Sequence, residues 1–203
     1  MNAELAQLRQ AGGAGLADVF SDHRGRLRRM VRFRLDRRLR GRIDPDDVLQ
    51  EAYIEISRRL QDYLDAPNVS FHVWARQITW QTLIDCHRVH LGMKRDPNQE
   101  VRLGGCRGNA TTFSIAHALI GSLTSPSAAA MRQERIDGLY EALDNMNEID
   151  REVLALRHFE HLDNGEVAEV LDLSPTAASN RYVRALGRLG NLLTSLSQYE
   201  DAS

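Results

Sequence analysis

Residues 164–186 read NGEVAEVLDLSPTAASNRYVRAL, and this stretch decides how the C-terminal half of the chain folds. Val167 and Leu171 have the spacing of a buried helix face, and a second helical pattern follows Ser174 and Pro175. A serine followed by a proline is typical of a helix start, because the hydroxyl caps free backbone N–H groups and proline fits the first turn. The stretch therefore predicts a short helix, a tight turn and a longer helix, which is the layout of a DNA-binding helix-turn-helix.

The second of these helices carries the side chains that would meet DNA. Four residues are predicted to face the core: Ala168, Leu173, Ala178 and Tyr182. The outward positions are Thr176, Ser179, Asn180, Val183 and Arg184, with Arg181 beside them. Short polar side chains near a helix N-terminus can reach base edges in the major groove, whereas arginines reach phosphates.

An ordinary pair of packed helices is the alternative interpretation of this pattern. Five carboxylates make the first helix and its flanks acidic: Glu160, Asp163, Glu166, Glu169 and Asp172. Because nonspecific DNA affinity comes from neutralised phosphates, we expect the isolated module to bind DNA weakly and to need a larger assembly.

Helical spacing recurs along the 203 residues, without sustained period-two alternation or an Asn-Gly hairpin. We predict an all-α chain of two small helical domains, residues 1–91 and 126–203, joined by a glycine-rich, polar linker over 92–125 with room for one short helix. No run approaches the roughly 20 apolar residues of a membrane span. Cys86 and Cys106 form no CxxC pair, so no disulfide framework or cysteine zinc site is expected, and a reducing cytoplasm fits.

Ten arginines crowd into residues 24–42, with Asp36 as the one opposing charge. Apolar residues recur there at every fourth position: Leu27, Val31, Leu35 and Leu39. This spacing predicts a cationic helix with a narrow apolar stripe, which Gly41 ends. Residues 1–95 carry 17 Lys/Arg against 12 Asp/Glu, and residues 96–203 carry 9 against 16. The positive field suits phosphate, with a solvated helix face as the other interpretation.

Asp44 and Pro45 predict the start of the next helix, and Ala66-Pro67-Asn68 predicts its end. Its apolar positions leave one group of side chains together outside: Asp47, Gln50, Glu51 and Ile54. An exposed isoleucine among carboxylates suggests a protein interface, although a solvated helix face is the alternative.

A third helix is predicted from Ser70 to His90. One polar face of this helix carries Gln77, Gln81, Asp85 and Arg88. We expect Trp74 in the core and Trp80 incompletely buried by a three-helix domain. Amides can hydrogen-bond base edges and an exposed aromatic ring can stack on them, so this face suits unstacked bases.

Two further helix starts are predicted before the helix-turn-helix, at Ser125-Pro126 and at Asn147. The first helix would bury Ile136, Leu139, Tyr140, Leu143 and Met146. The second would bury Ile149, Val153, Leu154, Leu156 and Phe159.

Five C-terminal segments carry a family resemblance: 142–143 (AL), 150–157 (DREVLALR), 165–168 (GEVA), 173–175 (LSP) and 180–186 (NRYVRAL). They resemble the fourth conserved region of RNA polymerase sigma factors, in particular the small extracytoplasmic-function group of the sigma-70 family. The resemblance implies that residues 174–186 read the minus-35 promoter element, with Ser179, Asn180 and Val183 facing bases, Arg181 and Arg184 near the backbone, and Thr176 at the helix start. Asp172 stands where the family usually has a turn glycine.

Residues 44–53 (DPDDVLQEAY) and 71–88, from FHVW to DCHR, resemble the second conserved region of the same family. The resemblance implies that a helical coiled coil of the polymerase largest subunit binds Asp46, Asp47, Gln50, Glu51 and Ile54. It also implies that the minus-10 element meets Tyr63, Asn68, Ser70, Gln77, Trp80, Gln81, Asp85 and Arg88. The glycine-rich segment falls where the family keeps a variable linker.

As a whole, the resemblance implies a non-enzymatic, cytoplasmic factor that directs promoter recognition, DNA melting and transcription initiation. The implied partners are promoter DNA and the RNA polymerase core, through the coiled coil of its largest subunit and its flap. From the resemblance alone, an anti-sigma factor is a further candidate partner. No cofactor, metal or membrane insertion is expected.

Two other classes of protein stay open on the residues alone. A metal-dependent enzyme could use Asp46, Asp47, Glu51 and Glu55, or Cys86, His87 and His90. The carboxylates lack a partnering histidine on the same segment, and adjacent Cys86 and His87 suit one ligand at most. An ordinary regulator would bind a palindromic operator as a dimer without the polymerase.

Overall fold

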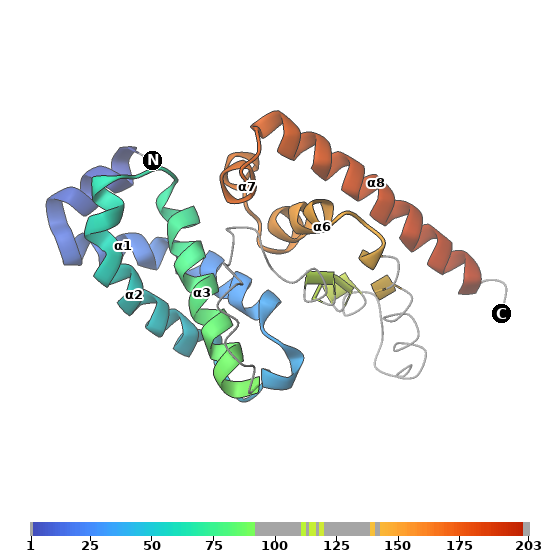
Figure 1. The fold of residues 1–203 in the computed structure, drawn as a ribbon, viewed down its shortest axis with the longest axis horizontal. Helices are drawn as coiled ribbons and strands as arrows, with labels where there is room; N and C mark the ends of the chain where they lie inside the picture. The colour runs from blue at the N-terminus through green and yellow to red at the C-terminus, as the bar shows by residue number, and fades with distance from the viewer. Residues whose placement is uncertain are drawn as a thin grey trace. The chain divides into compact units, whose positions relative to one another are not determined.

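The computed structural model of the chain describes residues 2–91, 111–112, 114–116, 118–119, 139–140 and 143–200 (Figure 1). The chain divides into two compact units, residues 1–103 and 104–203. Every regular element named in the described ranges is a helix, which confirms the prediction of an all-α chain with two helical domains. No helix in these ranges is long and apolar enough to cross a membrane. The predicted helix start at Ser125-Pro126, Ile136 and most of the linker predicted over 92–125 lie outside the described residues.

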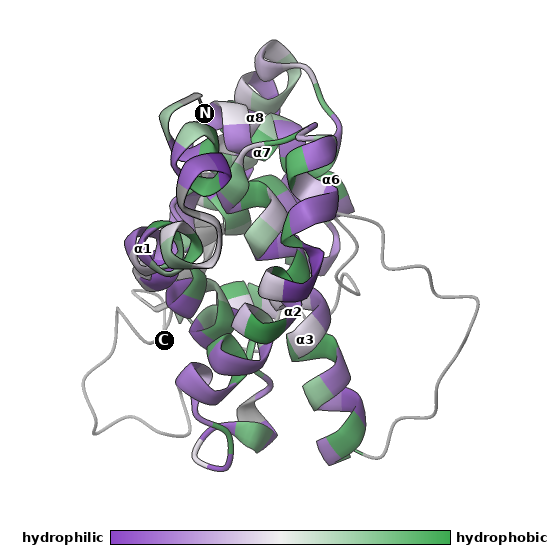
Figure 2. Ribbon diagram, turned by 90° about the vertical axis from the view of Figure 1, so that its left-hand side faces the viewer, coloured by the Kyte–Doolittle hydropathy of each residue, from purple (hydrophilic) through white to green (hydrophobic). Residues whose placement is uncertain are grey.

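The N-terminal unit consists of α1 (Asn2–Arg34), α2 (Pro45–Asp65) and α3 (Phe71–Leu91), with a short 3-10 turn η1 (Arg37–Leu39) after α1. Each of the three helices packs against the other two, and each contributes a fully buried residue, namely Leu27, Ile56 and Leu83. Figure 2 shows hydrophilic and hydrophobic residues alternating around these helices, as expected when each helix buries one face. Each such side chain contributes about 1.5–3 kcal/mol by its burial.

The α2 helix begins and ends where the sequence predicts. The Asp44 carboxylate accepts a hydrogen bond from the Asp46 backbone N–H at 2.9 Å, and Pro45 occupies the first turn. Ala66 is the C-terminal cap. The N-terminal cap Asp44 fixes the position of the first turn of α2, where Asp46 and Asp47 lie.

The arginine-rich helix ends earlier than predicted, at Arg34 rather than at Gly41. Leu39 is buried as expected, but it belongs to η1, which turns the chain toward α2. Gly41 has a φ of +90°, a left-handed conformation that favours glycine, so it shapes the turn and does not cap the helix. α1 also extends back to Asn2, with a kink at Gly12. From the sequence, no helix is predicted over this N-terminal segment.

The C-terminal unit contains α6 (Glu148–Leu154), a π-helical turn η2 (Ala155–Phe159), α7 (Asn164–Leu171) and α8 (Pro175–Glu200). The helix α8 packs against both α6 and α7. Asn147 caps α6 by accepting a hydrogen bond from the Ile149 backbone N–H at 3.0 Å, as predicted. Val153, Leu154 and Leu156 are buried, also as predicted.

Ile149 is 39% exposed, so the prediction that it lies in the core is wrong. Polar residues are buried in α6 instead: Asp150, Arg151 and Glu152 are all buried, the Asp150 carboxylate accepts from Arg181, and the Glu152 carboxylate accepts from Thr111. The Arg151 guanidinium donates to three backbone carbonyls of the preceding turn, at 2.7–2.9 Å.

Part of the predicted linker belongs to the C-terminal unit. The described residues between 111 and 119 are helical, and the Thr111 hydroxyl donates to the Glu152 carboxylate at 3.2 Å. Ile115 is fully buried, and so are Leu139 and Leu143 of the predicted preceding helix.

Candidate functional site

Side chains cap the starts of both α7 and α8. Asp163 and Glu166 form a reciprocal capping box at the start of α7, with N···O distances of 2.8 and 2.9 Å. Ser174 Oγ accepts from the Ala177 backbone N–H at 3.1 Å, which starts α8 as predicted. Asp172 has a φ of +52°, so it adopts the left-handed turn conformation that glycine usually supplies. The helix-turn-helix layout predicted from residues 164–186 is therefore present.

The outward face of α8 carries the residues predicted for the minus-35 element. Thr176, Ser179, Asn180, Val183 and Arg184 are exposed, and Ala178 is buried as predicted. Val183 is 65% exposed, so its apolar side chain is available to a partner beside the polar residues of this face. This combination suits the major groove, where an apolar side chain can contact a thymine methyl group beside polar readers.

Arg181 lies apart from this face. Its Nη1 donates to Asp150 Oδ1 of α6 at 2.9 Å, and Arg188 Nη1 donates to Asp150 Oδ2 at the same distance. The Asp150 side chain is only 6% exposed, so the two arginines neutralise a buried charge. These ion pairs tie α8 to α6. No spacing in the sequence identifies this pairing, because the residues lie 31 and 38 positions apart.

Tyr182 provides a second connection between α8 and the preceding helical turn. The guanidinium carbon of Arg157 lies 5.1 Å from the centre of the Tyr182 ring, within cation–π range. Arg157 also donates to the Leu162 carbonyl at 3.3 Å. Tyr182 is half-buried, so its ring supports α8 from the inner side.

In the N-terminal unit, α2 exposes the face that the sequence predicts. Asp47, Gln50 and Glu51 are exposed, and Ile54 is 45% exposed. We refer to these four residues as the docking face. An exposed isoleucine that follows two exposed carboxylates on the same helix face has the chemistry of a protein interface with a basic partner.

Asp46 was predicted to belong with these residues, but it lies outside the docking face as defined here, because its carboxylate is paired with arginines of α1. Arg24 Nη2 lies 2.9 Å from Asp46 Oδ1, and Arg28 Nε lies 3.1 Å from Asp46 Oδ2. Asp46 therefore joins α1 to α2, a role that the sequence does not indicate.

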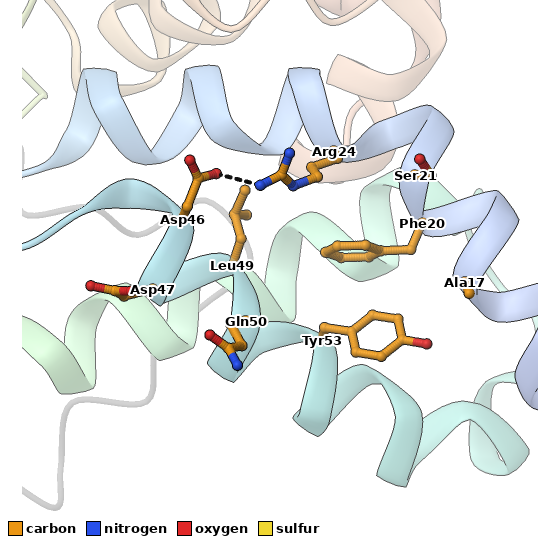
Figure 3. Close-up of a pocket in the computed structure, with 9 residues that line it drawn as sticks. All are labelled: Ala17, Phe20, Ser21, Arg24, Asp46, Asp47, Leu49, Gln50 and Tyr53. Atoms are coloured by element: carbon orange, nitrogen blue, oxygen red, sulfur yellow. Dashed lines mark hydrogen bonds and ion pairs between the residues drawn. The ribbon is translucent and has the colours of Figure 1, made fainter.

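A hollow of about 400 Å³ lies between α1 and α2, next to the docking face (Figure 3). Phe20, Leu49 and Tyr53 give it an apolar lining, and the rings of Phe20 and Tyr53 meet edge-on with centres 5.0 Å apart. Asp47 and Gln50 belong to both the hollow and the docking face. The hollow can therefore accept a long side chain with an apolar stem and a positive end.

The polar face of α3 is accessible in part. Gln77 and Asp85 are exposed, and Gln81 is half-buried. Asp85 accepts from Gln81 Nε2 at 3.2 Å and from Arg88 Nη1 at 3.0 Å, so these three side chains form one polar chain along the helix. Gln77 lies one turn before Gln81 on the same helix.

The two tryptophans exchange their predicted environments. Trp80 is buried, at 7% exposure, and the Arg34 guanidinium lies 5.2 Å from its ring. Trp74, expected in the core, is half-buried. The expectation that Trp80 is incompletely covered is wrong because the long α1 helix covers it with Arg34, which is itself buried.

The loop between α2 and α3 is held by Tyr63. This residue is buried, its hydroxyl donates to the Val69 carbonyl at 3.1 Å, and its ring stacks on Trp74 with centres 4.4 Å apart. Asn68 is exposed in this loop, and Ser70 Oγ accepts from the Val73 backbone N–H at 3.4 Å. Tyr63 therefore supports the loop, while Asn68 is the exposed residue among the three predicted from this loop, Tyr63, Asn68 and Ser70.

His87 connects α3 to the end of α1. Its Nε2 accepts from the Asp36 backbone N–H at 3.3 Å, which requires the neutral ring nitrogen. Burial lowers the pKa of His87 below the ordinary histidine value, and this outweighs the opposing effect of Asp36. Burial likewise raises the pKa of the Cys86 thiol. Within the described ranges, no group of three His, Cys, Asp or Glu side chains could hold a metal ion.

Comparison with known families matches both units in chain order. The model of "Sigma-70 region 2" matches residues 19–90, and the model of "Sigma-70, region 4" matches residues 136–189. The chain belongs to the sigma-70 family of RNA polymerase sigma factors. Within this family it is of the extracytoplasmic-function type, so its function is promoter recognition and transcription initiation, without catalysis of its own. Proteins of this family bind the RNA polymerase core and DNA.

Individual relatives agree with this assignment. The chain is 28% identical to the RNA polymerase sigma-H factor of Pseudomonas aeruginosa over 153 residues, which is 75% of each protein. It is 31% identical over 148 residues to the probable RNA polymerase sigma factor RfaY of Xanthomonas campestris, covering 73% of this chain and 34% of that protein. Among solved structures, CnrH in complex with the cytosolic domain of CnrY has a similar fold, with a TM-score of 0.52, 21% identity, and 95% and 96% of the two chains covered.

Proposed function

We propose that the docking face of α2 binds a basic helical coiled coil of the polymerase largest subunit. The support is the exposure of Ile54 on the same helix face as the exposed carboxylates Asp47 and Glu51, together with the adjacent hollow lined by Phe20 and Tyr53. An arginine of the partner would lay its stem against the rings and direct its guanidinium toward Asp47. Asp46 contributes by holding α1 and α2 together, since Arg24 and Arg28 occupy its carboxylate.

The polar face of α3 and the loop over residues 66–70 read the minus-10 element in this proposal. Gln77, Gln81, Asp85 and Arg88 offer amide, carboxylate and guanidinium groups to unstacked bases, and Asn68 is accessible beside them in the loop. Tyr63 and Trp80 are buried, so we assign them the role of supporting this surface rather than contacting bases. Ser70 holds the loop to the first turn of α3.

The exposed face of α8 reads the minus-35 element in the same proposal. Ser179, Asn180 and Val183 meet base edges, Thr176 lies at the helix start, and Arg184 meets a phosphate. Arg181 positions the helix through Asp150, because its guanidinium is engaged at 2.9 Å in the free protein.

Further partners follow from the family and from one structural neighbour. CnrH was solved in complex with the cytosolic domain of CnrY, and we infer that an anti-sigma partner of this kind regulates the present chain. We also infer a contact of the C-terminal unit with the polymerase flap, and a cytoplasmic location where the polymerase works.

The observation that carries the proposal is the separation of the two base-reading surfaces on two helical units of one chain. Each unit alone presents few cations at its reading face, so each binds DNA weakly without the other and without the polymerase. Fluorescence anisotropy with a labelled promoter duplex tests this directly. We expect weak binding by the chain alone and tight binding by the chain with core polymerase. Tight binding of a palindromic duplex by the chain alone would instead indicate an operator-binding regulator.

A further inference from the structure

The first residues of α1 fold back over the N-terminal unit. α1 is kinked at Gly12, whose φ of +52° is a left-handed conformation that favours glycine. Glu4 Oε1 lies 3.0 Å from His23 Nε2, although residues 19 positions apart in a straight helix would be about 28 Å apart. The chain therefore reverses at the kink. We refer to residues 2–10 as the N-terminal arm.

The N-terminal arm is packed against the helices of its unit. Leu8 is fully buried, and Leu5 is half-buried. Because burial removes the apolar surface of Leu8 from water, it favours one fixed place for the arm. The arm precedes residue 19, where the match to the sigma-70 family begins, and the proposed function gives it no role.

One contact of the arm lies at the α2 end of the loop proposed to read the minus-10 element, residues 66–70. Arg9 Nη2 donates to the Leu64 carbonyl at 3.1 Å. Leu64 belongs to the last turn of α2, where backbone carbonyls have no acceptor role within the helix. Arg9 therefore satisfies a carbonyl that lies directly before the loop (Figure 1).

A second contact of the arm leads to the α3 end of the same loop. Glu4 bonds His23, and the His23 ring centre lies 5.6 Å from that of Phe71, the first residue of α3. The Phe71 ring in turn lies 6.0 Å from Tyr63, whose hydroxyl donates to the Val69 carbonyl inside the loop. The arm is thus connected to both ends of the loop.

We propose that the N-terminal arm is a positioning element for this loop: Arg9 and Glu4 hold its two ends so that Asn68 is presented to a promoter base. This inference rests on the proposed function of the loop. The arm leaves Asn68 exposed, so it supports the loop without covering that side chain. A loop whose ends are held loses less conformational entropy on binding a base than a free loop does.

The test uses the full-length chain assembled with core polymerase, on the strongest promoter found by run-off transcription of the fragmented genome. Arg9→Ala removes the bond to Leu64, whereas Arg9→Lys keeps a charged donor. Gln10→Ala is the matched control, because Gln10 is exposed on the same arm. Promoter affinity is measured at several salt concentrations, strand opening by the permanganate reactivity of thymines, and core affinity with fluorescently labelled protein.

We expect Arg9→Ala to bind core normally and to weaken promoter binding and opening about three- to tenfold, the range that the loss of one hydrogen bond can produce. Arg9→Lys should restore most of this loss, and Gln10→Ala should match the wild type. Glu4→Ala should act in the same direction as Arg9→Ala, because it releases the other end of the loop. No effect of either alanine variant on promoter binding would refute the proposal.

Two further results of the Arg9→Ala experiment would overturn the proposal. The slope of log K against log salt should stay unchanged, because the guanidinium binds a carbonyl of the protein. A smaller slope would mean that Arg9 contacts a phosphate directly. A fall in core affinity would mean that the arm belongs to the interface with the polymerase.

The double variant Arg9→Ala/Asn68→Ala distinguishes positioning from a contribution to stability alone. If Arg9 acts by presenting Asn68, the double variant should bind the promoter about as weakly as Asn68→Ala does. Fully additive losses would refute the positioning role.

Asn68→Ala by itself separates this inference from the proposed function of the loop. If it leaves the preference for minus-10 sequences unchanged, base reading by Asn68 falls, and the inference falls with it. If Asn68→Ala alters that preference while Arg9→Ala and Glu4→Ala have no effect, base reading stands and the role of the arm alone is refuted.

Discussion

Arg181 of α8 donates to the buried carboxylate of Asp150 in α6 at 2.9 Å, and Arg188 binds the second oxygen of the same carboxylate. The pair fixes the orientation of the helix that carries Ser179 and Val183. Under the proposed function, Arg181 would therefore affect promoter contact by orienting α8, without touching DNA.

Asp150→Asn should therefore destabilise the C-terminal unit by about 1–3 kcal/mol. This is less than the 3–5 kcal/mol typical of a fully buried pair, because Arg188 is largely exposed. Both tryptophans lie in the N-terminal unit, so their fluorescence reports only the unfolding of that unit. In urea, the unfolding transition of the C-terminal unit, followed by far-UV circular dichroism, should move to lower urea concentration. The transition followed by tryptophan fluorescence should stay where it is in the wild type. Asp144→Asn, at an exposed carboxylate 3.6 Å from Arg151, is the control and should change little. Equal transitions for Asp150→Asn and the wild type would refute the structural role.

Neighbouring carboxylates of α2 should have different roles, because Asp47 and Glu51 should bind core polymerase whereas Asp46 should stabilise the N-terminal unit. Asp47→Lys/Glu51→Lys should weaken core binding tenfold or more, which is about 1.4 kcal/mol, with unfolding unchanged. Asp46→Asn should instead cost about 0.5–1 kcal/mol of stability, because it breaks partly exposed ion pairs to Arg24 and Arg28. Titration of labelled protein with core measures the first effect, and Asp62→Lys on exposed α2 surface is the control. Unchanged core affinity in the double variant would remove the docking face from the account.

Substitutions of Trp80 and of Gln77 should change different properties: the first should lower the stability of the N-terminal unit, and the second should change promoter preference. Trp80→Ala should lose about 3–5 kcal/mol in urea unfolding, because a buried aromatic residue is removed and Arg34 loses its ring contact. Gln77→Ala should leave unfolding unchanged and alter the preference among minus-10 sequences in transcription assays. A Trp80→Ala protein of normal stability with altered promoter preference would show that the indole contacts bases after all.

Substitutions on α8 should remove different kinds of promoter contact, a phosphate contact at Arg184 and a base contact at Asn180. Arg184→Ala should weaken binding equally for all minus-35 sequences and lower the salt slope by about 0.9, the value for one phosphate of duplex DNA. Asn180→Ala should change the sequence preference and leave the slope unchanged. Binding of holoenzyme to a library of minus-35 variants at several salt concentrations distinguishes the two patterns, and identical profiles would contradict the assignment.

The stability of the N-terminal unit should fall in mild acid through His87. Its pKa is lowered in the folded protein, so the unfolded state binds more protons below the ordinary histidine value of 6.5. The contribution of His87 to the free energy of unfolding is therefore complete above pH 6.5, and it is lost as the pH falls toward the folded-state pKa. Unfolding followed by tryptophan fluorescence at pH 7.5 and 5.5 should show a smaller pH effect in His87→Gln than in the wild type. His90→Gln, at an exposed position, should keep the wild-type difference, and equal pH effects in all three proteins would exclude His87.

The sequence predicted features that depend on local chemistry. Helix starts at Asp44, Asn147 and Ser174 follow from side chains that cap nearby N–H groups, and the exposure of Ile54 and Val183 follows from helical periodicity. Each of these requires only residues within a few positions of one another.

Features that depend on distant packing were not predictable in the same way. The burial of Trp80 requires Arg34 of α1 to cover it, and the inward face of α6 is polar because Asp150 finds Arg181 and Arg188 in α8. Periodicity assigns polar residues to the surface, so it placed Ile149 inside and left these pairs unseen. The end of α1 at Arg34 likewise depends on Leu39 being buried from a turn.

Run-off transcription is the most direct test of the central claim, that two separate reading surfaces act together on one promoter. Core polymerase from the organism that encodes the chain is incubated with fragmented genomic DNA, with and without the protein, and the transcripts are sequenced. The account predicts transcripts that appear only with the protein, whose starts share an upstream pair of motifs at fixed spacing. Substitution of Gln77 or Val183 should each change one motif only. The account is contradicted if the protein stimulates no transcription from any fragment and does not associate with core.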